Sequence, residues 1–72
     1  MRRITPGQVW VNGRTAVKVQ DNEGKLELVT FELKNSALRF RKSGIYEEGK
    51  AAKYIQNLKC KYTTKVLAAV ER

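Results

Sequence analysis

Three cations near the middle of the chain are the residues whose types and spacing point most directly to chemistry. Arg39 and Arg41 stand two residues apart in an alternating stretch, residues 37–42, and Lys42 follows at once. In a strand, Arg39 and Arg41 share one face, and their positions are roughly 6.5–7 Å apart. This distance matches the spacing of neighbouring phosphates along a nucleic-acid strand to within about an angstrom. The spacing therefore predicts a phosphate-binding strand. A solvated strand whose cations protect a sheet edge explains it as well.

Two aromatic residues are candidates for stacking on bases beside these cations. Trp10 points opposite Val9 and Val11 in a predicted strand, so its indole either reaches the surface and stacks on a base or belongs to the core. Tyr46 follows the basic strand closely, and rings interleaved with arginines suit single-stranded ligands. Both residues are therefore part of the predicted site, with a core position as the alternative for Trp10.

Further basic residues extend the predicted contact surface. Lys50 and Lys53 are three residues apart and share one side of a predicted helix, where simple solvation is the alternative. Arg2 and Arg3 lie in residues 1–5, which we expect to form a flexible basic arm able to follow a nucleic-acid backbone. The predicted nucleic-acid-binding residues are Arg39, Arg41, Lys42, Arg14, Lys50, Lys53, Tyr46 and Trp10.

The charge of the chain favours a polyanionic partner. Its 72 residues hold 15 Lys and Arg against 7 Asp and Glu, a formal net charge of +8. Residues 33–66 carry nine cations and two acids, whereas residues 21–32 carry four acids and one cation. Net charge bears on partners and association rates rather than on the fold. Nucleic acid, an acidic protein surface and an anionic membrane are the polyanionic candidates; nucleic acid, DNA or RNA, is the leading one, and we expect no membrane partner.

The residues needed for catalysis or metal binding are scarce. The chain has no histidine, which removes the commonest general base and metal ligand. Cys60 is the single cysteine, so it forms no internal disulfide and builds no zinc site. Glu47 and Glu48 are adjacent, a spacing that points their side chains apart on a helix. We expect a protein that is not an enzyme and binds no cofactor. The lone thiol and the lack of a signal-peptide or membrane-spanning stretch fit the cytoplasm.

Alternating apolar residues and tight turns predict four strands in the first part of the chain. Asn12-Gly13 is a strong hairpin signal, since a type I′ turn needs positive φ at both central residues. The apolar face switches within residues 28–29, which predicts a bulge or bend there. We expect Leu38 and Phe40 to point inward and Ser43-Gly44 to end the fourth strand. The predicted strands are 8–11, 14–20, 25–33 and 37–42.

The pattern then changes to that of a helix. Ala51, Tyr54, Ile55 and Leu58 recur at helical spacing, and we place the firm helix from about residue 50 to residue 59. Residues 62–70 fit either a final strand or a short helix, and their β-branched content favours the strand. Together these elements predict one α+β domain over residues 1–72: a curled antiparallel sheet or partly open barrel of four or five strands, with one helix.

The N-terminal motif offers a resemblance. Residues 4–10, Ile-Thr-Pro-Gly-Gln-Val-Trp, followed by an alternating strand, resemble the opening of small phage- and prophage-encoded Src-homology-three-like or KOW-type barrel domains of unassigned function. That resemblance implies a cytosolic accessory protein that binds nucleic acid or is directed at the host. Phosphate-backbone binding is our leading hypothesis. The alternatives are an inhibitor or adaptor that binds a host protein, and a phage structural or assembly protein. We expect a monomer or a small homo-oligomer.

Overall fold

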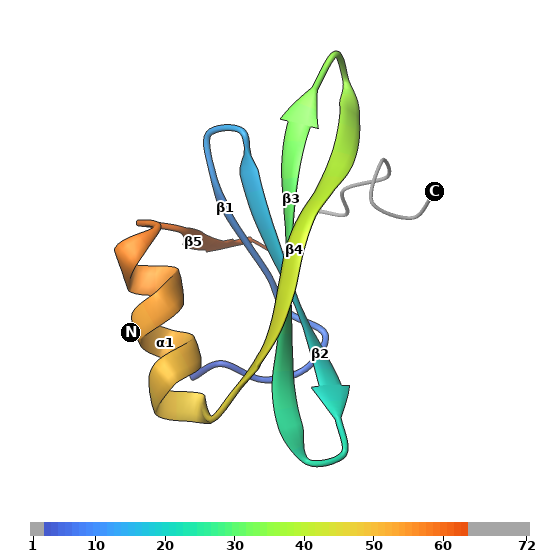
Figure 1. The fold of residues 1–72 in the computed structure, drawn as a ribbon. Helices are drawn as coiled ribbons and strands as arrows, with labels where there is room; N and C mark the ends of the chain where they lie inside the picture. The colour runs from blue at the N-terminus through green and yellow to red at the C-terminus, as the bar shows by residue number, and fades with distance from the viewer. Residues whose placement is uncertain (1–2, 64–72) are drawn as a thin grey trace.

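The computed structural model describes residues 3–63, which form five antiparallel strands and one helix (Figure 1). The strands pair in the order β4-β3-β2-β1-β5, so the curled sheet is open, with β4 and β5 at its edges. This confirms the predicted α+β class; the sheet does not close into a barrel. The elements are β1 (Val9–Asn12), β2 (Thr15–Asn22), β3 (Lys25–Lys34), β4 (Ala37–Tyr46), α1 (Glu48–Asn57) and β5 (Lys61–Thr63).

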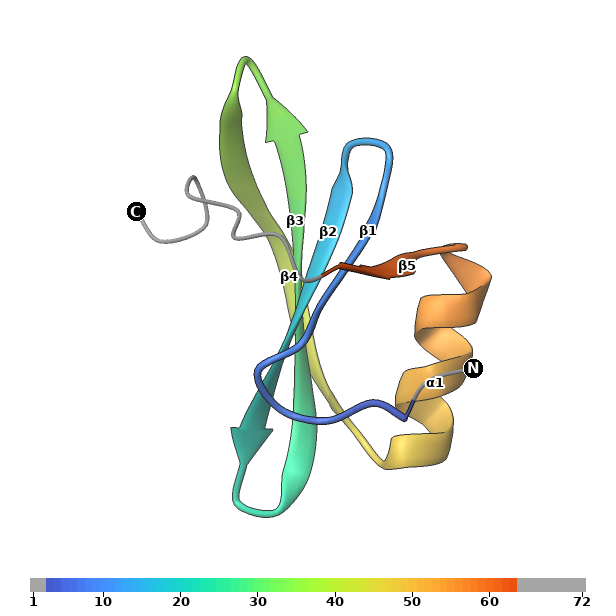
Figure 2. The same ribbon diagram turned by 180° about the vertical axis from the view of Figure 1, so that it is seen from behind.

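The first four strands form a meander joined by three tight turns. The turns span residues 12–15, 22–25 and 34–37, and each contains residues with positive φ. The predicted hairpin is present, but its turn is not the predicted type I′ with positive φ at both central residues: Asn12 ends β1 opposite Thr15, and within this turn only Gly13 has positive φ, +57°. Because successive strands reverse direction, the first and third turns lie at one end of the sheet and the second at the other (Figures 1 and 2).

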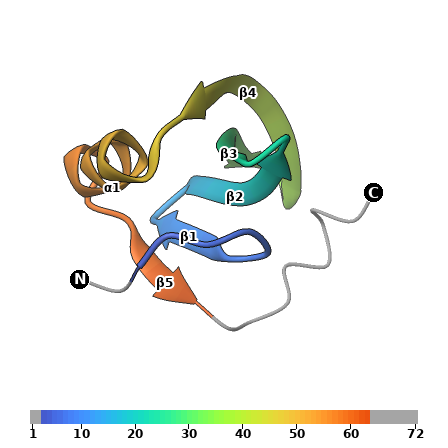
Figure 3. The same ribbon diagram turned by 90° about the horizontal axis from the view of Figure 1, so that it is seen from below.

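Helix α1 covers one face of the sheet and carries the chain from the β4 edge to the β5 edge (Figure 3). Ala51 and Ile55 are fully buried, while Tyr54 and Leu58 pack against the core from half-buried positions. These four residues confirm the predicted apolar face of the helix. The helix begins at Glu48, where a carboxylate interacts favourably with the helix dipole.

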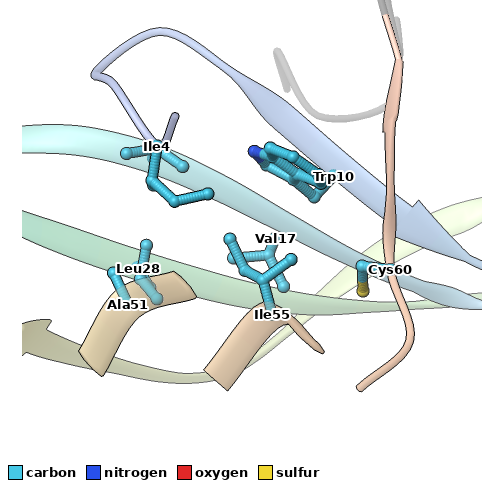
Figure 4. Packing of buried hydrophobic residues seen from close by; sticks show 8 residues of the cluster. Ile4, Trp10, Val17, Leu28, Ala51, Ile55 and Cys60 are labelled. Atoms are coloured by element: carbon cyan, nitrogen blue, oxygen red, sulfur yellow. The ribbon is translucent and has the colours of Figure 1, made fainter. Parts of the chain in front are cut away.

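The core lies between α1 and the sheet (Figure 4). Trp10 is only 4% exposed, donates its indole N–H to Gln8 Oε1 at 3.1 Å and meets Tyr62 edge to face, with ring centroids 5.6 Å apart. Because the core is small, each of its residues contributes noticeably to the free energy of unfolding: truncating a buried leucine to alanine costs about 2–5 kcal/mol. The cluster contains Ile4, Trp10, Val17, Val19, Leu28, Ala51, Ile55 and Cys60.

Strand β4 is longer than predicted. It continues through Ser43 and Gly44 to Tyr46, and Gly44 pairs with Leu28 inside the ladder. The turn predicted at Ser43-Gly44 is therefore wrong. Glycine serves here to leave space, because a Cβ at Gly44 would lie 2.9 Å from the ring of Tyr46.

The bulge predicted at residues 28–29 is absent there, where β3 pairs regularly with both neighbours. The irregularity lies in β4: Phe40 and Lys42 face consecutive residues of β3, which leaves Arg41 as the extra residue. The apolar switch in the sequence has a different cause. Strand β3 carries apolar side chains on both faces, and α1 covers only one of them.

For this reason Leu38 and Phe40 do not point into the core. They lie on the face of the sheet opposite α1, where Phe40 is 61% exposed. Strand alternation predicts correctly that the two residues share a face. It contains no information on which face the helix will cover.

Both ends of the described chain are anchored. Ile4 is buried in the core, and the guanidinium of Arg3 donates two hydrogen bonds to Glu48, of 2.9 and 3.0 Å. Residues 3–5 therefore do not belong to a free arm. At the other end, β5 pairs with β1 from Lys61 to Thr63, which confirms the predicted strand at residues 62–63; the rest of the strand predicted to residue 70 lies outside the described residues.

Candidate nucleic-acid interface

The meander brings cations from distant parts of the sequence to one end of the sheet. The turns at residues 12–15 and 34–37 both lie there, and Leu33 N–H donates to the carbonyl of Arg14 at 2.6 Å. The side-chain amide of Asn12 donates to the carbonyl of Leu58 at 2.7 Å, which joins the end of α1 to the same region. We call this region the basic end. Its cations are Arg14, Lys34, Arg39, Arg41, Lys42, Lys59 and Lys61.

The opposite end of the molecule is acidic. It contains the turn at residues 22–25 and the start of α1, which line one hollow together. Arg3 is engaged there by Glu48, and this hydrogen bond lowers the pKa of the Glu48 carboxyl. The protein therefore has a charge asymmetry along its strands. The acids of this acidic end are Asp21, Glu23, Glu27, Glu47 and Glu48, and the cations beside them are Arg3, Lys25 and Lys50.

The bulge gathers the three predicted cations of β4 on one side. In the ladder, Arg39 lies opposite Glu32, and Arg41 Nη1 lies 3.4 Å from Glu32 Oε1. In an unbroken strand Lys42 would point away from Arg39 and Arg41. With Arg41 as the extra residue, Lys42 instead faces Thr30, on the same side of the sheet as Glu32. The predicted cluster exists, but one acid partly neutralises it.

Arg41 and Lys42 border a hollow of about 430 Å³ between α1 and the sheet. Lys42 Nζ lies 5.2 Å from the ring centroid of Tyr54, close enough for a cation–π interaction. The hydroxyls of Tyr54 and Thr30 share a 2.7 Å hydrogen bond, which positions the ring under the ammonium group. The hollow is lined by Thr15, Thr30, Phe31, Glu32, Arg41, Lys42, Tyr54 and Leu58.

The two predicted stacking residues are used for packing. Trp10 is buried, so its core position holds and its ring is not exposed to a base. Tyr46 packs on Tyr54, with ring centroids 5.4 Å apart, and leans over Gly44. Phe40, predicted to point inward, is instead exposed between Arg39 and Arg41 in the chain. The alternation Arg-Phe-Arg correctly predicts that Phe40 and Arg39 point to opposite faces of the sheet. The prediction that the face of Phe40 is the core face is wrong.

The predicted helical cations lie apart from the basic end. Lys50 is in the first turn of α1, at the acidic end, and Lys53 lies one turn further along on the exposed surface. The structure therefore does not bring Lys50 together with the cations of β4. Lys34 and Lys59 belong to the basic end although neither was in the predicted site, because the turns and the helix end, not sequence proximity, bring them there.

Comparisons with protein-family models, with curated proteins and with solved structures find no match to this chain. Within residues 3–63, no group of three or more acidic, histidine or cysteine side chains is arranged to hold a metal ion. Over the same residues, the one helix is neither long nor apolar enough to cross a lipid bilayer.

Proposed function

We propose that this protein binds nucleic acid through the phosphate backbone, using the cations of the basic end. The observation that carries the proposal is the collection of seven cations from three parts of the chain, with Glu32 as the acid among them in the described structure. A cluster of this kind attracts phosphates and releases the counterions condensed on them. A small intracellular accessory protein without catalytic activity, of the phage type that the N-terminal motif suggests, fits this role.

The structure supports backbone contacts over base recognition. Helix α1 turns its apolar face to the sheet and lies beside the core, so it is not placed as a recognition helix for a major groove. Trp10 and Tyr46 are packed rather than free to stack. We therefore expect binding that depends steeply on salt and weakly on base sequence.

Titration at two salt concentrations tests the proposal. The protein is titrated against single-stranded DNA, duplex DNA and RNA, with and without Arg39→Ala and Arg41→Ala together. Removing two phosphate contacts should lower the slope of log K against log salt by about 1.4 for a single strand and about 1.8 for a duplex. The matched control is Lys25→Ala with Lys50→Ala, which removes the same charge near the acidic end.

The control variant should keep the slope of the parent protein. Equal binding by the Arg39/Arg41 double variant and the parent would remove these arginines from the site. The cations would then act only to protect the edge strand β4 from pairing with strands of other molecules. Their positive charge and the bulge both oppose such pairing. In that case the double variant should aggregate more readily than the parent.

One observation favours a second candidate, an adaptor or inhibitor that binds a host protein. The sheet face opposite α1 exposes large apolar side chains, which proteins bury against other proteins more often than against nucleic acid. Capture of partners from a lysate after nuclease treatment separates the two functions. A specific host protein that stays bound at moderate salt supports the adaptor, and loss of every partner supports nucleic-acid binding.

A further inference from the structure

The sheet has a second apolar face that no described helix or strand covers. Helix α1 lies on the face of Trp10, Val17 and Leu28, and the ladder register places alternate residues on the opposite side (Figure 3). We call this side the open face. Its partly or strongly exposed apolar residues are Val9, Val11, Phe31, Leu33, Leu38, Phe40 and Ile45; Ala16 and Val29 lie on the same side but are only 5% and 8% exposed.

Several of these side chains are strongly exposed. Phe40 is 61% exposed, Ile45 is 55% exposed and Leu33 is 40% exposed. Phe31 and Phe40 meet edge to face with ring centroids 6.4 Å apart, which makes a raised aromatic pair on this surface. Single exposed apolar residues are ordinary on a protein surface, but a contiguous patch that spans several strands marks an interaction site.

We infer that the open face binds the open face of a second copy of this chain, so that two sheets pack face to face. Packed sheets lie about 10 Å apart with their strands nearly aligned. Strands β2 to β4, at about 3.4 Å per residue and 4.8 Å between strands, offer roughly 500 Å² per copy. Two copies would bury on the order of 1,000 Å², the lower limit for a specific interface. An interface at this lower limit is expected to be weak and reversible.

The charges favour a second copy in one orientation. Each chain is basic at one end and acidic at the other, so an antiparallel pair brings the basic end of each copy over the acidic end of its partner. Lys18 on β2 and Glu27 on β3 both lie on the open face. A two-fold axis makes every contact reciprocal, so Lys18 of each copy can meet Glu27 of the other. The open face therefore complements itself in charge as well as in apolar surface.

Sedimentation velocity of the nuclease-treated protein, over a concentration series around the micromolar range, tests the inference. We expect a monomer–dimer equilibrium whose dissociation constant rises at least about tenfold in Phe40→Ser with Ile45→Ser, because apolar residues at the centre of an interface carry most of its affinity. Both side chains are exposed in the monomer, so the variant keeps its fold. The matched control, Lys53→Ser with Gln56→Ser on the exposed side of α1, should dimerise like the parent.

A charge exchange makes the test specific for a second copy. Lys18→Glu places like charges opposite each other in the antiparallel pair and should weaken the dimer, and adding Glu27→Lys should restore it. Dimerisation should respond to Phe40→Ser with Ile45→Ser, whereas nucleic-acid binding should respond to Arg39→Ala with Arg41→Ala. Failure of this inference is thus distinguishable from failure of the proposed function.

Three results would overturn the inference. A monomer at every concentration excludes the dimer. A dimer unaffected by Phe40→Ser with Ile45→Ser uses another surface. A monomer that binds an apolar dye only after removal of residues 64–72 would assign the open face to the chain's own C-terminal segment.

Discussion

Glu32 offers the sharpest test of where nucleic acid binds, because it is the acid that lies among the cations of the basic end. Its carboxylate accepts a hydrogen bond of 3.4 Å from Arg41 and lies opposite Arg39 in the ladder. A phosphate bound by either arginine would lie near this negative charge. Substituting Glu32→Gln removes the charge, keeps the size of the side chain and frees Arg41 for a ligand.

The expected gain follows from Coulomb's law. At about 7 Å in a solvent-exposed site, one phosphate and one carboxylate repel each other by about 0.6 kcal/mol. The exposed ion pair that Arg41 must give up is worth at most about 1 kcal/mol. Together the two effects predict binding about threefold to fifteenfold tighter at low salt. Loss of a single exposed ion pair should leave the melting temperature nearly unchanged.

Fluorescence anisotropy with a labelled oligonucleotide measures this gain, with Glu23→Gln as the control. Glu23 lies in the turn at the acidic end, and its substitution changes the net charge by the same amount. Seven residue steps of β3, about 24 Å, separate the turn of Glu23 from Glu32, which is more than two Debye lengths at about 0.1 M salt, so Glu23→Gln should leave the affinity nearly unchanged. An equal gain in both variants would show a response to net charge alone, and no gain in Glu32→Gln would remove the basic end from the binding site.

Two further predictions concern the fold. Gly44→Ala should destabilise the protein by about 1–3 kcal/mol in denaturant titrations, because the new Cβ would lie 2.9 Å from the ring of Tyr46; Gly49→Ala, in α1 with no atom within 4 Å of the added Cβ, should instead raise stability by up to about 1 kcal/mol. Burial raises the pKa of the Cys60 thiol, so the folded state disfavours the thiolate and stability should fall as the pH rises above about 8.5. Alkylation of Cys60 should likewise be slow until the protein unfolds, and rapid reaction in the native state would contradict this burial.

Local signals in the sequence were sufficient for most of the fold. The Asn12-Gly13 turn, the alternating strands and the helical spacing from Ala51 to Leu58 each depend on residues close together in the chain. The pairing of β5 with β1 depends instead on the helix crossing the sheet, and no local pattern contains it. The same limit applies to the basic end, since Arg14 and Lys59 meet there only through the topology.

The side-chain directions show a second limit. A strand with apolar residues on both faces does not show which face will be covered, and β3 carries Leu28 on one side with Val29 and Phe31 on the other. The helix packs on the face that carries Trp10. As a result Trp10, which was a predicted stacking residue, is buried, and Phe40 on the opposite face is exposed. Burial of the larger indole favours this outcome, because the free energy of burial grows with the apolar area removed from water.

The two proposed surfaces constrain each other. Arg39, Arg41 and Lys42 lie on the α1 side of the sheet, together with Thr30 and Glu32, so a dimer through the opposite, open face leaves these cations accessible. An antiparallel pair places the two basic ends at opposite ends of the assembly, about one molecular length of 32 Å apart. One turn of duplex DNA measures about 34 Å. Two sites at this spacing can contact one duplex together, and the second contact then gains from the high effective concentration that the first creates. Dimerisation would thus raise affinity for nucleic acid without adding a single contact to either basic end.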